Sequence, residues 1–462
     1  MTFVILPPSL VCGITDWQAH ISPGRGSPLH SAATLSPQPH RACGACGASG
    51  NTVCHHQRFI VPDGYPLPSE YDVVVCRRCG FVYADPAATQ SDYDRFYCQW
   101  SKYDDSATAT GSGVSPHDAA RLAITASDIA RSLPSRAASI LDAGCATGGL
   151  LTALRNHGFS AVAGLDPSPH CAAACRDRGF EAYVGSISSA TAPTHMPKFD
   201  CVVFSHVLEH VYDIPAFFTA ARRLLAPGGY LYLETPDATR YNDYLYAPFQ
   251  EFNTEHINHF SARALENIAR RFGFQPVVVE QKVIQTGPHT LYPAVFGLFH
   301  DNGGNADEHS VVCDQELPSR IAAYIRQSTE QMERINRHLA SQLTNTRSVF
   351  LWGAGQLAMK LLTLPSLAHI QVRAVIDNNP VLRGKTLAGA PVIGPQEIGP
   401  QEIGSHKIGL REIAGTTEPI IIATLLHADE IGAQVRRLGL SNPVISLLPT
   451  PDSDPHSEIS RA

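Results

Sequence analysis

The sequence predicts an α/β fold, with a doubly wound sheet in the middle of the chain, a small cysteine-bearing module before it and a Rossmann-like domain after it. Three observations predict it. Apolar runs of strand length alternate with helical patterns from about residue 115 to residue 280. A second pattern of this kind, with its own glycine turn, begins at Val349. The chain has 462 residues, too many for one hydrophobic core, which favours two or three domains.

The N-terminal segment, residues 1–40, carries Pro, Ser, Gly and scattered His without periodicity. Its one short apolar run, Phe3 to Leu6, meets two prolines and has no basic leader, so it makes a poor signal peptide. We expect a disordered extension here. We expect a second disordered segment in the Pro-, Ser- and Asp-rich tail at residues 451–462.

The next segment holds two turns of the form Cys-x-x-Cys-Gly, 29 residues apart, which carry Cys43, Cys46, Cys76 and Cys79. Each turn presents two thiolates to one tetrahedral ion, so the pair predicts a structural Zn²⁺ site with no open position for chemistry. Cys54, beside two histidines, could substitute as a ligand, although its spacing is worse. The alternatives are free cysteines in a loop-rich arm or a redox motif, which is usually single and precedes a helix.

The most informative stretch runs from Ile140 to Leu150 and reads as a buried strand, a glycine turn and the start of a helix. A second strand, Ala161 to Leu165, leads to Asp166, an acid placed where nucleotide-binding α/β units hold a ribose diol. The turn has the form Asp-x-Gly-x-x-x-Gly and departs from the Gly-x-Gly-x-x-Gly of dinucleotide loops. This form resembles motif I of the class I S-adenosylmethionine methyltransferases.

That resemblance implies S-adenosylmethionine as the cofactor. The turn from Gly144 to Gly148 would face the amino-acid end of the cofactor, and Asp166 would accept both ribose hydroxyls. Ser186 follows a short strand where this superfamily often places an acid against adenine, so the serine is a departure. The predicted cofactor-binding residues are Asp142, Gly144, Cys145, Gly148, Asp166, Ser186 and Ser205.

The remaining elements follow from the same periodicities. In the central region we predict strands at 139–142, 182–184, 199–205 and 230–234, and helices at 150–157 and 213–225, the second closed by a Pro-Gly-Gly turn. An amphipathic helix spans about 318–343. The last region begins with a strand and glycine turn at 349–355, followed by a helix at 357–364 and strands at 374–377 and 419–423. A pentapeptide repeated in tandem up to residue 403 predicts an extended loop or helix start.

Two histidine-carboxylate clusters follow the cofactor motifs. The first, residues 205–210, closes a strand, and the second, residues 252–260, lies in a loop before a helix. Histidine accepts a proton near neutral pH, and a neighbouring carboxylate can orient it or tune its pKa. We predict His256 as the catalytic base, Glu255 as its neighbour and His210 as a further catalytic-site residue. Simple packing of these histidines is the alternative.

The order of these features resembles one family, the sugar C-methyltransferases that act on nucleotide-linked deoxy-sugars. The shared features are zinc knuckles, a methyltransferase core, a Glu-His loop and a Trp-Gly-Ala-Gly domain, and they cover nearly everything from Cys43 to Leu448. In that family the substrate is a thymidine-diphosphate 4-keto sugar. A base removes the proton next to the ketone, the enolate attacks the sulfonium methyl, and the C-terminal domain helps to hold the nucleotide sugar.

The resemblance implies a role for each matching residue. His256 would be the base, and Glu255 and His210 would bind the sugar and stabilise developing charge. A tyrosine after the zinc module would line the site, with Tyr97 and Tyr103 as candidates.

The chain departs from the family pattern in two places. The family loop reads Tyr-His-Glu-His, whereas residues 253–256 are Asn-Thr-Glu-His. The Gly-Ala-x-x-Lys-Gly pattern is replaced at 353–358 by Gly-Ala-Gly-Gln-Leu-Ala, without that lysine. These departures keep open an O- or N-methyltransferase of a glycan precursor or small metabolite. A zinc-ribbon interaction protein that binds the cofactor without turnover is a third interpretation.

The predicted organisation is a disordered extension (1–40), a zinc-binding module and linker (41–114), a methyltransferase domain (115–285), a connecting segment with a long helix (286–347), a Rossmann-like domain (348–450) and a tail (451–462). A formal charge of −7 argues against a nucleic-acid partner, and no apolar run is long enough for a membrane span. The two cysteine knuckles favour a reducing, cytoplasmic setting. We expect a small-molecule acceptor as partner, with a homodimer as an option.

Overall fold

The computed structural model describes residues 40–100, 111–187, 196–288, 290–303, 311–395 and 413–449. The N-terminal extension up to residue 39, Tyr103, most of the tandem repeat and the C-terminal tail lie outside these residues. The chain divides into two compact units. The first comprises residues 1–56, 71–244 and 255–324, and the second comprises residues 57–70, 245–254 and 325–462. The six domain ranges predicted above remain predictions.

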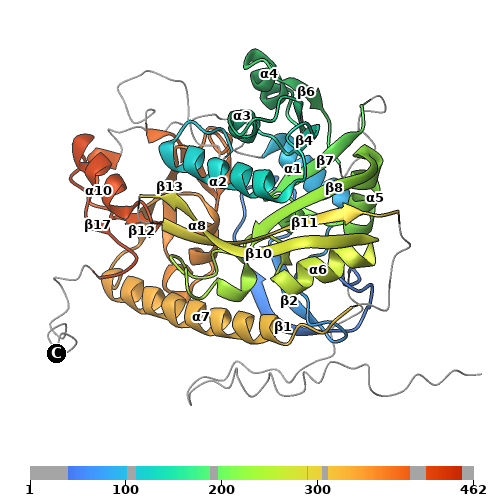
Figure 1. The fold of residues 1–462 in the computed structure, drawn as a ribbon. Coiled ribbons are helices and arrows are strands. Elements are labelled where there is room, and N and C mark those ends of the chain that lie inside the picture. The colour runs from blue at the N-terminus through green and yellow to red at the C-terminus, as the bar shows by residue number, and fades with distance from the viewer. Residues whose placement is uncertain are drawn as a thin grey trace, which may run out of the picture. The chain divides into compact units, whose positions relative to one another are not determined.

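A seven-stranded sheet forms the centre of the first unit, in the order β10-β11-β8-β7-β4-β5-β6 (Figure 1). Its strands are β4 (Ile140–Ala143), β5 (Val162–Asp166), β6 (Glu181–Val184), β7 (Phe199–Ser205), β8 (Leu225–Pro236), β10 (Phe274–Gly287) and β11 (Thr290–Asp301). The strands from β8 to β6 run parallel, while β11 is antiparallel to both of its neighbours.

The strand order reverses between β4 and β7, the neighbours that lead away to opposite edges of the sheet. In open α/β sheets, ligands bind beyond the carboxyl ends of the strands at such a reversal. The loops after β4, β5 and β7 carry the predicted cofactor residues. The predicted doubly wound fold is therefore confirmed. Its topology brings these loops together at the carboxyl ends of the strands, the edge at which the candidate site lies.

Helices cover both faces of this sheet. They are α2 (Pro116–Ser132), α3 (Gly149–Asn156), α4 (Pro169–Asp177), α5 (Ile214–Leu224) and α6 (Ala262–Arg271). Leu122 of α2 and Leu151 of α3 join one buried cluster with Val203 of β7. The next residue, Phe204, points to the opposite face, where its ring lies 4.6 Å from that of Phe217 in α5. This alternation along β7 reflects the two-residue period of a strand buried on both faces.

A four-stranded sheet, β1-β2-β3-β9, contains the strands of the N-terminal module. It consists of β1 (Asn51–Arg58), β2 (Glu70–Cys76), β3 (Val82–Asp85) and β9 (Asn258–His259), and helix α1 (Gln90–Gln99) follows β3 in the chain. The short strand β9 pairs antiparallel with β3, with His259 opposite Val82. The module thereby fixes the backbone just after the predicted base, a pairing that no sequence pattern indicates.

The second unit contains a six-stranded sheet in the order β14-β15-β13-β12-β16-β17. Its strands are β12 (Ser348–Trp352), β13 (Gln371–Ile376), β14 (Thr386–Leu387), β15 (Ala390–Ile393), β16 (Ile420–Ile422) and β17 (Val444–Ile445), with helices α8 (Gln356–Leu361) and α10 (Ala428–Arg437). All pairs are parallel except β14 with β15. Phe350, Trp352 and Ile376 lie in its buried core.

The predicted long helix is α7 (Glu316–Gln342), and four of its five predicted apolar positions are buried: Ile321, Ile325, Ile335 and Leu339. The predicted turn at Pro227-Gly228-Gly229 falls within the bounds of β8. Leu225 pairs with Phe199 of β7, and the pairing resumes only at Tyr230, so the segment is an irregular stretch of this strand. Helix α5 accordingly ends one residue earlier, at Leu224.

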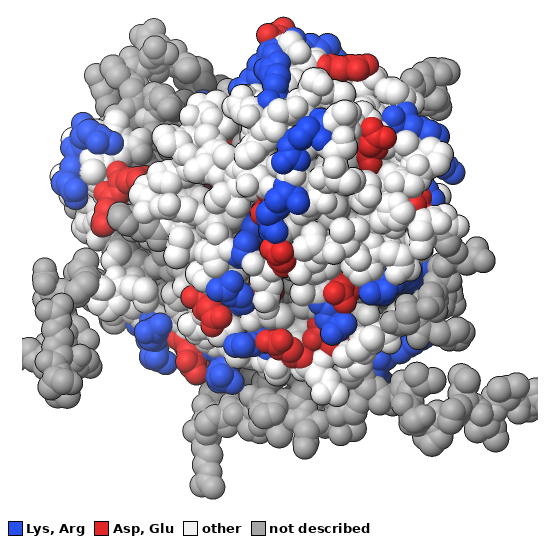
Figure 2. Space-filling view, viewed as in Figure 1, with Lys and Arg blue, Asp and Glu red and all other residues white. Residues whose placement is uncertain are grey.

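Within the described ranges, none of the helices combines the length and the apolar character needed to cross a bilayer. The face of the molecule seen in Figure 2 carries basic and acidic side chains interspersed with large uncharged areas.

Candidate active site

The glycine turn after β4 adopts the backbone that its residues predict. Gly144 and Gly148 have φ values of 89° and 86°, in the left-handed region that favours glycine. Gly148 is the N-cap of α3, and a β-carbon at Gly144 would lie 2.9 Å from the Val207 side chain. The turn therefore needs glycine at both positions, and it directs the start of α3 toward the open edge of the sheet.

Two carboxylates lie beside this turn. Asp166, the last residue of β5, accepts hydrogen bonds from the Ala146 and Ser168 N–H groups, both at 2.9 Å. Asp142 is 3% exposed; burial, reinforced by the negative charge of Asp166, raises its pKa to about 7. The loop after β4 is thus hydrogen-bonded to Asp166, and Asp142 is a second buried acid at the end of β4.

Two buried hydroxyls at this edge could bind a polar ligand. Thr147, which is 3% exposed, and Ser205 at the end of β7 have hydroxyl oxygens without a hydrogen-bond partner among the described residues. Buried polar groups are nearly always hydrogen-bonded, so orphaned ones mark places where a bound molecule completes the network. The donor set of this edge, with its hydroxyls, turn N–H groups and the Asp166 carboxylate, fits a polar cofactor such as S-adenosylmethionine.

Two other predicted cofactor residues are placed differently. The Cys145 side chain is buried, and its sulfur lies 3.7 Å from that of Cys175. A β-carbon added at Gly164 would lie only 2.6 Å from the Cys145 sulfur. It packs inside the domain, so that only its backbone could reach a cofactor. Ser186 follows β6 with a half-buried side chain.

The predicted catalytic residues come together in the first unit. The rings of His210 and His256 meet edge to face with centroids 4.8 Å apart, and His210 Nδ1 lies 3.2 Å from the Glu255 carbonyl oxygen. Tyr97 of α1 packs edge-on against His210 at 5.8 Å, which fits the predicted tyrosine at the site. Burial lowers the pKa of His210, and the His256 charge adds to this while Glu209 opposes it.

The loop carrying His256 is held on its C-terminal side. The Ile257 N–H donates to the Glu209 carbonyl oxygen at 2.9 Å, and the Asn258 side chain donates to the carbonyls of Leu208 and Val211. Arg41 donates to the Ile257 carbonyl at 2.6 Å. These bonds join the loop to the turn that carries Glu209 and His210, and so they bring the two histidines together.

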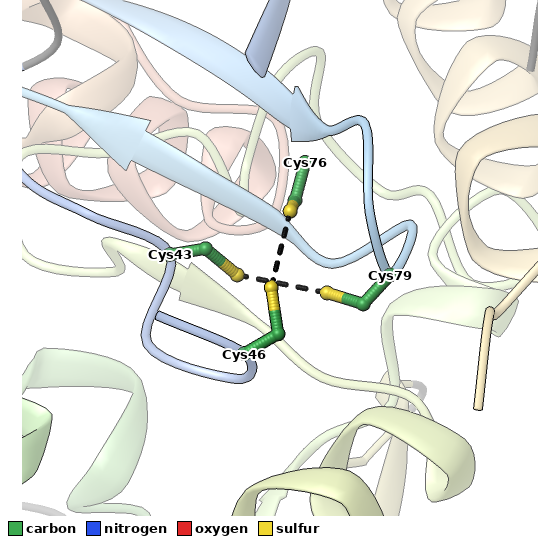
Figure 3. Close-up of side chains that lie close together, drawn as sticks. All are labelled: Cys43, Cys46, Cys76 and Cys79. Carbon is green, nitrogen blue, oxygen red and sulfur yellow. Dashed lines mark hydrogen bonds between the residues drawn. The ribbon is translucent and has the colours of Figure 1, made fainter. Parts of the chain in front are cut away.

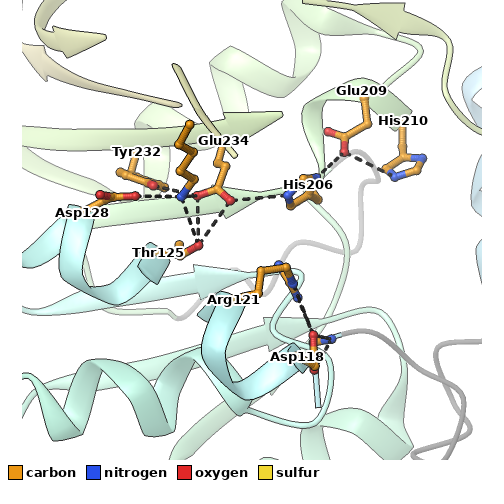
Figure 4. Close-up of polar contacts among 11 residues, drawn as sticks. Asp118, Arg121, Thr125, Asp128, His206, Glu209, His210, Tyr232 and Glu234 are labelled. Carbon is orange, nitrogen blue, oxygen red and sulfur yellow. Dashed lines mark hydrogen bonds and ion pairs between the residues drawn. The ribbon is translucent and has the colours of Figure 1, made fainter. Parts of the chain in front are cut away.

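A chain of buried charges leads away from this pair (Figure 4). His206 lies between two carboxylates, 3.3 Å from Glu209 and 3.4 Å from Glu234. Glu234 is fully buried and is bound by Lys282 at 2.8 Å, while Tyr232 and Thr125 donate hydrogen bonds to it. Burial would raise the pKa of Glu234, but Lys282 and His206 outweigh it and lower the pKa.

The four knuckle cysteines converge on one point (Figure 3). All are buried, their sulfurs lie within 4.8 Å of one another, and two of the pairs are 3.6 Å and 3.5 Å apart. A tetrahedral site with Zn–S bonds of about 2.3 Å has sulfur atoms about 3.8 Å apart. The cluster therefore fits a zinc ion. Cys54 is outside it and points its sulfur toward the Val73 carbonyl oxygen at 3.2 Å.

The glycine turn of the second unit is closed by its own acid. Gly353 has a φ of 111°, and the Ala354 N–H donates to Asp377 Oδ2 at 2.6 Å. The lysine missing from the expected position has a counterpart later in α8. Lys360 is buried and donates to the Phe249 carbonyl, and burial lowers its pKa to about 7.

Sequence reasoning missed several residues of this site. The cluster at residues 205–210 includes His206 and Glu209, but its sequence pattern predicted a catalytic role for neither. Thr147 was available as the position directly before Gly148. Lys282 carried no local signal, because it reaches Glu234 from 48 residues further along the chain.

Comparison with known proteins adds a family. The family described as a methyltransferase domain matches residues 117–279, the region of the seven-stranded sheet. The ubiquinone biosynthesis O-methyltransferase of Methylobacterium nodulans is 35% identical over 117 residues, covering 24% of this chain and 46% of that protein. The mitochondrial ubiquinone biosynthesis O-methyltransferase of Homo sapiens is 34% identical over 215 residues, covering 42% and 56%. The chain thus spans about half the length of these curated relatives.

Solved methyltransferase structures are similar at lower identity. The 1,6-didemethyltoxoflavin-N1-methyltransferase of Burkholderia thailandensis, with bound S-adenosylhomocysteine, is 16% identical with a TM-score of 0.35, covering 48% of this chain and 95% of that one. A methyltransferase of Methanosarcina mazei is 20% identical with a TM-score of 0.32, covering 38% and 96%. Residues 117–279 thus match a methyltransferase domain, and their sheet has the doubly wound topology predicted from the sequence.

Proposed function

We propose that the chain is a methyltransferase that adds a methyl group from S-adenosylmethionine to a carbon atom of a nucleotide-linked keto sugar. The observation that carries the proposal is the pair His210 and His256, 4.8 Å apart by ring centroids and backed by the Glu209 carboxylate. Transfer to carbon requires removal of a proton from a C–H bond, for which a histidine beside a carboxylate is suited. The sugar class comes from the resemblance in sequence.

When bound, S-adenosylmethionine supplies an electrophilic methyl group. His256 takes the proton from the carbon next to the ketone, and the electron pair of the broken C–H bond moves into the enolate. This pair would form the new C–C bond to the methyl group that the cofactor supplies, with the electrons of the methyl–sulfur bond left on the sulfur. Glu255 and His210 bind the sugar and stabilise its developing charge, with Tyr97 lining the site. Asp142, Asp166, Thr147 and Ser205 hold the cofactor with the turn from Gly144 to Gly148.

We also propose that Cys43, Cys46, Cys76 and Cys79 hold one structural Zn²⁺. The spacing of their sulfurs and their burial support this. The ion would tie two turns together and would leave no position for substrate. A zinc–thiolate site fits a reducing compartment such as the cytoplasm.

An O-methyltransferase is the second candidate. The curated relatives are named O-methyltransferases, and the chain lacks the tyrosine and first histidine of the sugar-family loop. Thr254, in place of that histidine, bonds within its own unit to Tyr65 at 2.7 Å and to Gln356 at 2.8 Å. In this case the acceptor is a hydroxyl, which needs only modest help from a base.

The test is a methyl-transfer assay with trideuteromethyl S-adenosylmethionine and a panel of nucleotide sugars, each in its 4-keto and its reduced form. Product mass and NMR connectivity identify the methylated atom. Methyl on carbon, from keto substrates alone, supports the proposal. Methyl on oxygen or transfer to reduced sugars favours the second candidate, and no transfer to any sugar contradicts the acceptor class.

His256→Ala tests the base. C-methylation should fall by at least about a hundredfold, the usual contribution of a general base. His427→Ala is the matched control, because this exposed histidine belongs to the second unit. Activity of the His256 variant within about threefold of the parent would exclude its role as the base.

A further inference from the structure

His206 is a histidine under unusual constraint. Its backbone has a φ of 57°, in the left-handed region that non-glycine residues rarely adopt, and its N–H donates to the Glu234 carbonyl oxygen at 2.8 Å. Its two ring nitrogens lie against different carboxylates, Nδ1 at 3.3 Å from Glu209 and Nε2 at 3.4 Å from Glu234. Strained residues persist where the surrounding structure determines them, often at functional sites.

Of the two carboxylates beside His206, that of Glu209 is the more sensitive to the loss of a neighbouring charge. Its side chain is 1% exposed to solvent, and neither oxygen meets hydrogen-bond geometry with any residue in the described part of the chain. It is stabilised by ion pairs, with His206 at 3.3 Å and with His210 Nε2 at 3.9 Å. A ring nitrogen of His256 also lies within 4.8 Å of a carboxylate oxygen of Glu209.

A dry carboxylate of this kind would normally take up a proton, because burial penalises the charged form. Here burial is outweighed by His206, His210 and His256, so the pKa of Glu209 is lowered. His206 can supply a lasting positive charge. Burial opposes it, but its two carboxylate partners outweigh burial and raise the pKa of His206 to about 9.

The second carboxylate, Glu234, shares the His206 charge but has a further cation beside it. Glu234 has a cation of its own, Lys282 at 2.8 Å, which also binds Asp128 at 2.7 Å. The His206 ring also lies near the Tyr292 ring of β11, with centroids 6.3 Å apart. Lys282 thus offsets part of the Glu234 charge, whereas His206 and His210 are the cations paired with Glu209.

We propose that His206 is a positioning residue that keeps Glu209 ionised against His210 and His256, so that an imidazole of this pair can accept a proton from the acceptor. The transfer of a proton from the acceptor rests on the proposed function, whereas the effect of His206 on Glu209 does not depend on any acceptor. As the acceptor C–H bond breaks, the proton moves to the imidazole, and the new positive charge forms within reach of Glu209. Without His206, Glu209 takes up a proton and this stabilisation is lost.

The experiment is an NMR titration of the intact protein labelled with ¹⁵N-histidine, without any acceptor. The His256 resonance is assigned by its loss in His256→Gln. In His206→Asn the cation is removed, and the titration midpoint of His256 should fall by about one to two pH units. Glu209→Gln removes the carboxylate charge directly and should shift the midpoint in the same direction.

His206→Lys keeps a cation at the same position and should bring the His256 midpoint back toward the parent value. A merely structural role for the imidazole would give no such rescue. His427→Asn is the control for a substituted histidine elsewhere and should leave His256 unchanged. Calorimetric binding of S-adenosylhomocysteine to each variant checks that the fold is retained.

An unchanged His256 midpoint in a folded His206→Asn protein overturns the inference, as does a shift in His206→Asn without one in Glu209→Gln. These outcomes are distinct from failure of the proposed function. No methyl transfer to any nucleotide sugar, combined with the expected shifts, would reject the acceptor and leave the role of His206 standing. C-methylation of a nucleotide sugar combined with an unchanged His256 midpoint would support the acceptor and reject the role of His206.

Discussion

At the scale of single residues, the cofactor edge is held in an electrostatically unfavourable state. Asp142 and Asp166 are both buried, and neighbouring carboxylates raise each other's cost of ionisation. The pKa of Asp142 in the folded chain is about 7, above its ordinary value of 3.8. The stability associated with this group is therefore fully present below about pH 4 and is lost as the pH rises through about 7. Binding sites commonly retain such strain because the ligand relieves it.

Asp142→Asn should consequently stabilise the cofactor-free protein at pH 8, by up to a few kcal/mol, and much less at pH 5. If the turn after β4 binds S-adenosylmethionine as proposed, the substitution should also weaken that binding about tenfold. Urea unfolding at the two pH values and calorimetry measure these effects. Asp177→Asn, on the exposed end of α4, is the control. Equal stability of parent and variant at both pH values would contradict the prediction.

At the scale of elements, the two cysteine knuckles have matching geometry. In each, the N–H of the glycine that follows donates to the carbonyl of the first cysteine, at 2.8 Å for Gly47 and 2.9 Å for Gly80. Both glycines have a φ of 76°, and a β-carbon at Gly80 would overlap the Asp314 backbone. The sheet of the module has only four strands, so a metal that joins the two turns should contribute to its stability.

Cys76→Ser should therefore remove one zinc ion per chain and lower the melting temperature of the protein. Cys54→Ser is the matched control, because its sulfur lies outside the cluster, and it should retain the full zinc content. Mass spectrometry of metals and thermal unfolding check both variants. Parent protein without zinc, with all four knuckle thiols open to a thiol reagent, would contradict the metal site.

At the scale of the whole molecule, the chain passes between its two compact units at 56/57, 70/71, 244/245, 254/255 and 324/325. The second unit is therefore assembled from three separate stretches of sequence. Residues 245–254, which directly precede Glu255, belong to it and are held by α8. Lys360 donates to the Phe249 carbonyl, and Gln356 bonds to Thr254. The segment that leads into the catalytic loop thus depends on a domain encoded about a hundred residues later.

Lys360→Met tests this dependence. Burial lowers the pKa of Lys360 to about 7 from 10.5, so the unfolded chain binds the extra proton between these values. The parent should gain stability as the pH rises through this window, by up to about 1.4 kcal/mol per pH unit, and the variant should lack this gain. Hydrogen exchange should accelerate in residues 245–254, because the Phe249 carbonyl loses its donor. Unaltered exchange there would show that Lys360 does not hold the segment.

Local patterns were sufficient for much of this protein. The strand-turn-strand run from Ile140 to Asp166 specified the cofactor edge, because its glycines and its acid act within one contiguous βαβ unit. The knuckle spacing specified the cysteine cluster for the same reason, since each turn closes on itself. Apolar periodicity predicted the strands and helices of residues 139–166 and 348–364 to within a few residues of their ends, whereas β10 and β11 were not predicted.

Long-range pairing decided what periodicity could not. The strand β9 joins the N-terminal module, so the backbone after His256 is fixed by residues about 175 positions earlier. His206 follows β7, Glu234 lies in β8 and Lys282 lies in β10, and their charges meet although Lys282 is 48 residues beyond Glu234 in the sequence. A sequence shows which residues can carry charge or accept protons. Burial and the neighbours supplied by distant strands set their protonation, and only the tertiary structure brings these neighbours together.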